Sequence, residues 1–175
     1  MLLLGGARSG KSALAVRLAR ESGRAVTFVA TAMPSDDEMA ARIARHRAER
    51  PPEWTTVEEP LELARAVREA AADETLVLDC LSLWVANLLE AGRSEEQIED
   101  DGRAAAAATA VREATTVAVS NEVGLGIVPV SPLGRRYRDV LGRVNAEWAS
   151  AADRTLLVVA GKALALAPAE SLLHD

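Results

Sequence analysis

The chain has 175 residues, of which 49% are hydrophobic and only 3% aromatic, and its formal net charge is −6. This composition predicts one domain over residues 1–175, with an aliphatic core that suits helices packed on a parallel sheet. The negative charge argues against a nucleic-acid-binding protein. We expect a cytoplasmic protein without a membrane span, because no apolar run is long enough for a bilayer and the one cysteine, Cys80, excludes an internal disulfide.

The first distinctive stretch follows a short apolar run at residues 2–4. It matches G-x-x-x-x-G-K-[ST], the phosphate-binding loop between a strand and a helix. The glycines of this motif let backbone N–H groups point at phosphate oxygens, its lysine contacts the β- and γ-phosphates, and its last hydroxyl binds Mg²⁺. A chance match is the alternative, but the apolar run before it and the helical pattern after it are what the motif requires. The motif consists of Gly5, Gly6, Ala7, Arg8, Ser9, Gly10, Lys11 and Ser12.

Strands and helices are predicted to alternate along the rest of the chain. The apolar, β-branched runs predict strands at 2–4, 25–30, 54–58, 75–79, 116–120 and 155–160. The helical patterns and caps predict helices at 11–20, 37–47, 60–72, 81–89, 94–114 and 131–151. The pattern after Gly161 is too weak to predict an element. This alternation predicts an α/β fold with a mostly parallel central sheet flanked by helices.

Ligands of such folds gather at the carboxyl ends of the strands, where polar residues follow several of the predicted strands. Asp79 follows four apolar residues, as does the acid that supports Mg²⁺ opposite the loop hydroxyl in phosphate-loop enzymes. The alternative is an aspartate that caps the next helix. Because the phosphate loop is present, we favour the metal role for Asp79, together with Ser12.

A basic segment surrounds one of the two histidines of the chain. On the predicted helix over 37–47, Met39, Arg42, Ile43 and His46 share one face because they are spaced three, four and seven residues apart. One interpretation is an amphipathic helix whose histidine lies beside the core. The four arginines near this histidine instead favour a polyphosphate site, in which a neutral imidazole is a competent nucleophile toward phosphorus.

Two further segments have both a structural and a functional interpretation. Glu58 and Glu59 precede a predicted helix, where they would cap it and compensate its dipole, or would bind a ribose or a base. The residue pattern alone favours the capping role. Residues 121–129 combine polar groups at a strand end with two glycines, which is typical of a flexible loop and equally of a substrate-contacting segment with glycine hinges.

Taken together, these motifs resemble a known family, the bifunctional adenosylcobinamide kinase/adenosylcobinamide-phosphate guanylyltransferases of cobalamin biosynthesis. The resemblance covers the chain up to about residue 160. The phosphate loop alone is common to many families, whereas the segments around His46 and Asn121 are far more specific. The matching segments are 5–12, 30–32, 37–39, Arg42-Ile43-x-x-His46-x-x-x-Arg50-Pro51, 79–81 and 121–129.

The resemblance implies a P-loop NTPase with a RecA-like sheet, a homotrimeric assembly and two reactions. In the first, the hydroxyl of the aminopropanol arm of adenosylcobinamide, a corrinoid, takes the γ-phosphoryl group of ATP or GTP. In the second, GTP guanylylates His46, and GMP then passes to the cobinamide phosphate to give adenosylcobinamide-GDP. Lys11 and His46 are the implied catalytic residues. Besides the loop, the implied nucleotide-binding positions are Thr31, Ala32, Met33, Arg47, Ala48, Glu49, Arg50, Glu58 and Asp79.

The residues leave some alternatives open. Asp79 is shorter than the glutamate that some relatives carry, so it reaches either the metal or the ribose. A stand-alone phosphate-loop kinase with a structural His46 is one alternative function. A GTP-binding regulatory module is another, and it would transfer nothing to a cobinamide.

Overall fold

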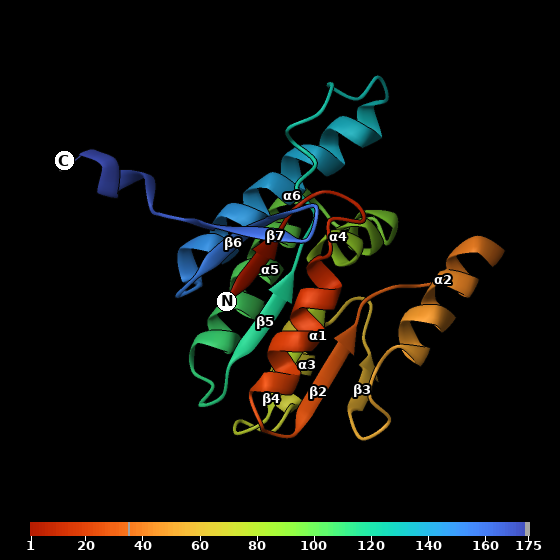
Figure 1. Ribbon diagram of the computed structural model, residues 1–175. Helices are drawn as coiled ribbons and strands as arrows, with labels where there is room; N and C mark the ends of the chain where they lie inside the picture. The colour runs from red at the N-terminus through yellow and green to blue at the C-terminus, as the bar shows by residue number, and fades with distance from the viewer. Residues whose placement is uncertain (35, 174–175) are drawn as a thin grey trace.

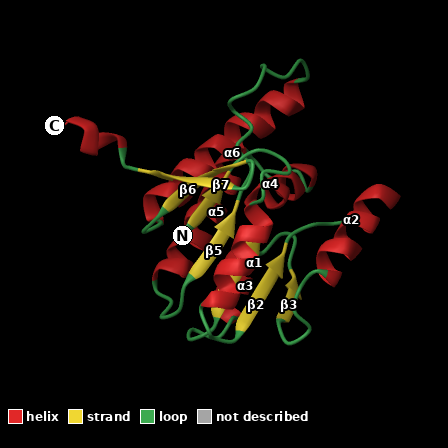
Figure 2. Cartoon of the chain, viewed as in Figure 1, coloured by secondary structure: helices red, strands yellow, loops and turns green. Residues whose placement is uncertain are grey.

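A seven-stranded sheet forms the centre of the computed structural model, which describes residues 1–34 and 36–173 (Figures 1 and 2). The strand order is β3-β2-β4-β5-β1-β6-β7. All neighbouring strands pair in parallel except β6 and β7, which pair antiparallel. The strands are β1 (Leu2–Leu4), β2 (Val26–Ala30), β3 (Thr55–Glu58), β4 (Thr75–Asp79), β5 (Thr116–Val119), β6 (Thr155–Val159) and β7 (Lys162–Leu166).

Helices cover the two faces of the sheet unequally. The helices are α1 (Lys11–Glu21), α2 (Asp37–Ala48), α3 (Leu63–Glu69), α4 (Leu81–Glu90), α5 (Glu95–Ala110) and α6 (Pro132–Ala151), with a short 3₁₀ helix, η1 (Ala169–Leu173). Leu2 and Leu4 point to the face covered by α3, α4, α5 and α6, whereas Leu3 points to the face covered by α1. This alternation follows from the two-residue period of a strand, and it explains why three consecutive leucines are all buried.

The predicted fold class is confirmed, and so are the predicted caps of α2, α5 and α6. Asp36 accepts a 2.7 Å hydrogen bond from the backbone N–H of Met39, and Ser131 accepts one from Gly134 at the start of α6. Ser94 and Gln97 form the predicted capping box of α5. Of the described helices, none is long and apolar enough to cross a membrane.

Two predicted helices are shorter in the structure, and one strand was not predicted. The carboxylate of Glu59 accepts hydrogen bonds from the N–H groups of Leu61 and Glu62, which holds these residues in a turn and delays the start of α3 to residue 63. Helix α5 ends at residue 110 because Arg112 leaves it to donate hydrogen bonds to four carbonyl groups at and beyond the end of α3. All five residues of β7 are exposed, so its sequence has no alternation of buried and exposed positions from which a strand could be predicted.

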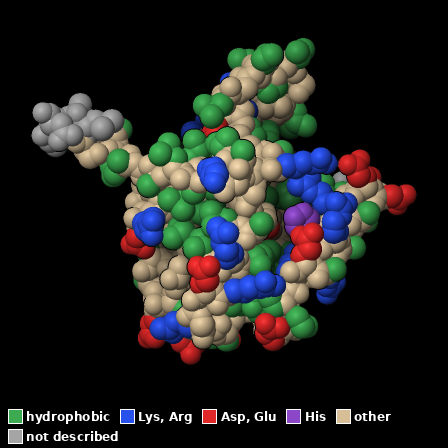
Figure 3. Space-filling view, viewed as in Figure 1, with side chains coloured by type: hydrophobic (Ala, Val, Ile, Leu, Met, Phe, Trp, Pro, Cys, Tyr) green, Lys and Arg blue, Asp and Glu red, His purple; other side chains and the backbone are tan. Residues whose placement is uncertain are grey.

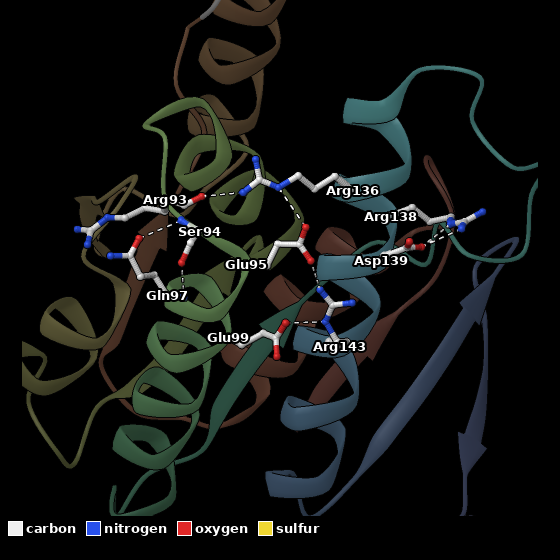
Figure 4. A network of polar contacts seen from close by, with 9 residues as sticks. All are labelled: Arg93, Ser94, Glu95, Gln97, Glu99, Arg136, Arg138, Asp139 and Arg143. Atoms are coloured by element: carbon white, nitrogen blue, oxygen red, sulfur yellow. Dashed lines mark hydrogen bonds and ion pairs between the residues drawn. The ribbon is translucent and has the colours of Figure 1, made fainter.

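The outer surfaces of α5 and α6 are joined by ion pairs (Figure 4). Arg143 contacts Glu99 at 2.5 Å and Glu95 at 2.6 Å, and Arg136 contacts Glu95 at 3.3 Å. Exposed pairs of this kind each contribute about 1 kcal/mol or less. The apolar contacts beneath them, which include Ile98, therefore hold the two helices together more strongly than the pairs do.

Candidate active site

The phosphate loop connects β1 to α1 in a conformation that requires its glycines. Gly5 has φ 151° and Gly10 has φ 101°, which are angles that residues with a side chain rarely adopt. A Cβ atom at Gly5 would lie only 2.2 Å from the carbonyl oxygen of Val158 on the neighbouring strand β6. No side chain caps the N-terminus of α1, so its first N–H groups remain for phosphate oxygens.

Lys11 is folded back over this loop. Its Nζ atom donates hydrogen bonds of 2.8 Å to the carbonyl oxygen of Gly5 and 2.7 Å to that of Gly6, and it lies 3.4 Å from the hydroxyl of Ser9. The side chain is buried, and burial lowers the pKa of the Lys11 ammonium group, although nearby Asp79 opposes that shift. The cation is therefore held at the centre of the loop, where a polyphosphate would lie.

Asp79 ends β4, and the hydroxyl of Ser12 lies close enough to its carboxylate to lower the pKa of that group. Burial raises the pKa of Asp79, while nearby Ser12, His46, Arg50 and Lys11 act in the opposite direction. A hydroxyl and a carboxylate side by side form an oxygen donor set that fits Mg²⁺, which usually takes few protein ligands and completes its shell with phosphate and water. The structure thus places the two predicted metal ligands together.

The helix that carries His46 lies beside the sheet rather than on it. Helix α2 has no buried residue, and Met39, Ile43 and His46 form its half-buried face, whereas Arg42, which the spacing predicts on the same face, is exposed. In Figure 3 the histidine lies among Lys and Arg side chains where α2 meets the body. The Nδ1 atom of His46 is 3.9 Å from the carboxylate of Glu49, and its side chain is 41% exposed. The imidazole is therefore accessible to a substrate.

Arg50 follows α2 and is held by an aromatic pair. Its guanidinium lies 3.9 Å above the ring of Phe28 on β2, and that ring stacks on Trp54 with the ring centres 6.5 Å apart. The Nε and Nη1 atoms of Arg50 are buried without a hydrogen-bond partner among the described residues. Burial lowers the pKa of this guanidinium, and Asp79 opposes that shift. Its N–H groups are thus positioned to donate to a phosphate.

The other predicted nucleotide-binding residues lie at different depths. The hydroxyl of Thr31 is fully buried and bonds to both the carbonyl oxygen and the N–H of Cys80 at 2.8 Å, so it joins the ends of β2 and β4. Glu58 is exposed at the end of β3 and contacts Arg47 at 3.1 Å. Glu59, rather than Glu58, has the capping role. Four others lie near the surface around α2: Ala32, Met33, Ala48 and Glu49.

A buried polar network behind the site was missed from the sequence. Asn145 on α6 accepts a 2.6 Å hydrogen bond from Ser120 and donates one of 3.0 Å to the carbonyl oxygen of Asn121. The side chain of Asn121 in turn donates to Ser82 on α4. Asn145 belongs to the apolar, buried face of α6, between Leu141 and Trp148. A polar asparagine on the apolar face of a helix is the sequence feature from which this network could have been predicted, because buried polar groups are hydrogen-bonded.

A phosphate loop after the first strand, with a half-buried acid at the end of the strand two positions away in a parallel sheet, defines a P-loop NTPase. A solved structure described as a prototypical ATPase from the type III secretion system of pathogenic bacteria shares this fold, with a TM-score of 0.53. Its sequence identity is 11%, and the match covers 98% of this chain and 59% of that chain. At this identity the likeness concerns the fold alone.

The family is shown by sequence. Residues 1–166 match the CobU family, described as cobinamide kinase / cobinamide phosphate guanyltransferase. The bifunctional adenosylcobalamin biosynthesis protein CobP of Pseudomonas aeruginosa is 47% identical over 161 residues, covering 91% of this chain and 92% of that protein. The bifunctional adenosylcobalamin biosynthesis protein CobU of Escherichia coli is 40% identical over 174 residues, covering 92% of this chain and 96% of that protein. The chain belongs to the cobinamide kinase / cobinamide phosphate guanyltransferase family.

Proposed function

We propose that this chain phosphorylates adenosylcobinamide with ATP or GTP and then transfers GMP from GTP to the product through a histidine–GMP intermediate on His46. The observation that carries the proposal is the convergence of two segments on one carboxylate. Lys11 from the phosphate loop and both His46 and Arg50 from the α2 segment lie close enough to Asp79 to act on the pKa of its carboxyl group. A triphosphate held by the loop would therefore lie within reach of an exposed imidazole.

The phosphate loop and α1 bind the triphosphate in both reactions. Ser12 and Asp79 would hold Mg²⁺, which neutralises charge on the phosphates when bound. Lys11 would leave the carbonyl oxygens of Gly5 and Gly6 and contact the β- and γ-phosphates. The buried N–H groups of Arg50 add a second fixed cation opposite the loop.

The guanylyl transfer needs a nucleophile, and His46 supplies it. Nδ1 of His46 lies 3.9 Å from the carboxylate of Glu49, so we assign the attack on the α-phosphorus of GTP to Nε2, on the other side of the ring. The N–P bond forms as the bond from the α-phosphorus to the bridging oxygen breaks, and pyrophosphate leaves. Arg47 and Arg50 stabilise this leaving group. The histidine–GMP phosphoramidate then transfers GMP to the cobinamide phosphate. The intermediate thus divides one difficult transfer into two easier ones.

The covalent intermediate is tested by mass spectrometry after incubation with GTP and Mg²⁺. We expect a mass increase of one GMP that is labile in acid and absent from His46→Ala. His174→Ala, which changes the other histidine of the chain, is the matched control and should label normally. Wild-type protein that phosphorylates adenosylcobinamide but never labels would be a stand-alone kinase. Protein that binds GTP and transfers nothing would be a regulatory module.

We also propose a homotrimer, the assembly that the family resemblance implies, and the segment after β5 exposes apolar side chains that fit an interface between copies of the chain. Leu125 is 84% exposed, Ile127 96% and Val130 95%, and the segment that carries them protrudes from the body before α6 (Figure 1). Light scattering should give three times the chain mass, and Ile127→Asp with Val130→Asp should give the monomer. Glu113→Lys, at an exposed acid before β5, is the control and should leave the assembly intact. A monomeric wild-type protein would contradict the proposal.

A further inference from the structure

The sheet order brings a glutamate to the phosphate loop. Strand β5 lies between β1, which leads into the loop, and β4, which ends at Asp79. Residues just beyond β5 are therefore placed between the loop and the acid that would hold Mg²⁺. The backbone N–H of Glu122 donates a 3.1 Å hydrogen bond to the carbonyl oxygen of Gly5, the same oxygen that accepts from Nζ of Lys11.

The carboxylate of Glu122 differs from the other acids at this edge of the sheet. Glu58 is paired with Arg47 at 3.1 Å, Glu59 with Arg65 at 2.5 Å, and Asp79 has the cations Arg50 and Lys11 nearby. Within residues 1–34 and 36–173, Glu122 forms no ion pair with a lysine or an arginine. One of its oxygens accepts a 2.5 Å hydrogen bond from the N–H of Gly124, and the side chain is half-buried. This carboxylate is thus oriented and free of a neutralising cation.

The buried network holds the end of β5 in place. Asn121, next to Glu122, is bonded to Ser82 through its side chain and to Asn145 through its carbonyl oxygen, each at 3.0 Å. Ser120, at the other side of Asn121, is fully buried and donates to Asn145. A catalytic group works best on such a rigid support, because little reorganisation remains at the moment of reaction.

We propose that Glu122 is the catalytic base of the kinase reaction, an inference that rests on the proposed function. The carboxylate accepts the proton of the attacking alcohol as that oxygen bonds to the γ-phosphorus. The bond from the γ-phosphorus to the β–γ bridging oxygen breaks, and the nucleoside diphosphate leaves with both electrons. Glu122 then returns the proton to water. The guanylylation of His46 needs no such base, because the imidazole nitrogen attacks with a free lone pair.

The test separates the two reactions with Glu122→Gln, whose amide oxygen can still accept from Gly124. We expect the kinase kcat to fall by about 10²- to 10⁴-fold, the usual range for general base catalysis. The KM for the nucleotide and the GMP labelling of His46 should stay within threefold of wild type. Glu122→Asp, which keeps a carboxylate, should recover part of the rate. Glu113→Gln, at the opposite end of β5, is the matched control and should behave like wild type.

Each other outcome overturns the inference. A kinase kcat within threefold of wild type for Glu122→Gln would exclude a base at this position. If Glu122→Gln lost both kinase activity and GMP labelling, Glu122 would instead serve nucleotide binding or folding. If Glu122→Asp had no kinase activity but labelled normally, Glu122 would be a packing residue. Wild-type protein that binds nucleotide but does not phosphorylate adenosylcobinamide would overturn the proposed function itself, and this inference with it.

Discussion

Lys11 and Gly5 are joined by a 2.8 Å hydrogen bond from Nζ to the carbonyl oxygen, across the mouth of the phosphate loop. That oxygen also accepts from the N–H of Glu122, so the loop, its lysine and the end of β5 meet at one atom. A nucleotide must replace the bonds of Lys11 with bonds to phosphate oxygens. The bonds to Gly5 and Gly6 keep the buried ammonium group satisfied until a phosphate arrives.

Replacement of Lys11 should abolish turnover and not only weaken binding. Lys11→Ala removes the cation that contacts the β- and γ-phosphates, so we expect the kinase kcat to fall at least 100-fold. Lys11→Arg should lose kinase activity as well. A planar guanidinium does not fit where a compact ammonium group contacts two carbonyl oxygens at 2.7 and 2.8 Å. Lys162→Ala, at the second lysine of the chain, is the control in a steady-state kinase assay. Retained activity in Lys11→Ala would show that the loop is only structural.

The two adjacent glycines of the loop should respond very differently to substitution. At Gly5 a Cβ atom would lie 2.2 Å from the carbonyl oxygen of Val158, and φ is 151°. We expect Gly5→Ala to lower the free energy of unfolding by about 3 kcal/mol and to abolish nucleotide binding. At Gly6 a Cβ atom would meet nothing within 4 Å, so Gly6→Ala should cost about 1 kcal/mol or less. Urea unfolding of the two variants makes the comparison, and equal midpoints would contradict it.

Local patterns were enough to predict much of the fold and part of the site. The loop motif, the strand-end Asp79 and the face of α2 that carries His46 each depend on residues close together in the sequence. The spatial neighbours of these residues cannot be read from nearby sequence in the same way. The partners of Thr31 lie 49 residues away at Cys80, and those of Asn145 lie 24 and 25 residues away, so only the folded sheet reveals them. The isolation of α2 from the core was also unpredictable, because an amphipathic pattern does not say what its half-buried face meets.

The raised pKa of Asp79 predicts that the site lowers stability at neutral pH. Burial raises the pKa of this carboxyl above its unfolded value, so ionisation costs the folded state more than the unfolded one. The cost is absent below the unfolded pKa of about 4 and is fully present once the pH exceeds the folded pKa. Asp79→Asn removes the charge and should therefore be more stable than wild type at pH 8, by a margin that shrinks as the pH falls toward the unfolded pKa.

Thermal unfolding of both proteins without Mg²⁺, across pH 5 to 8, measures this margin. Added Mg²⁺ should raise the melting temperature of the wild type, because it replaces the cost with a favourable interaction, and should have little effect on Asp79→Asn. Glu122→Gln is a useful comparison, since it removes a half-buried acid from the neighbouring strand end. A constant margin between Asp79→Asn and wild type from pH 5 to 8 would mean that Asp79 does not titrate in this range in the folded protein.

Asn145 should affect the kinase reaction although it lies on α6, behind the sheet end. Asn145→Ala leaves the hydroxyl of Ser120 without its acceptor and the carbonyl oxygen of Asn121 without its donor. Each unsatisfied buried group costs about 1–3 kcal/mol, so we expect a loss of about 3 kcal/mol in the free energy of unfolding. The end of β5 would also become less fixed, and the kinase kcat should fall more than the KM for the nucleotide rises.

A double-mutant cycle with Ser120→Ala isolates the contact between Ser120 and Asn145. Ser120→Ala removes the hydroxyl that Asn145→Ala would leave without an acceptor. The double variant should therefore lose about 1 kcal/mol less stability than the sum of the single variants. Urea unfolding gives the stabilities, and the kinase assay shows whether kcat recovers in parallel. Additive losses would mean that the 2.6 Å contact contributes nothing of its own. Recovered stability without recovered kcat would place the catalytic effect in the bond from Asn145 to Asn121, the one that holds the residue beside Glu122.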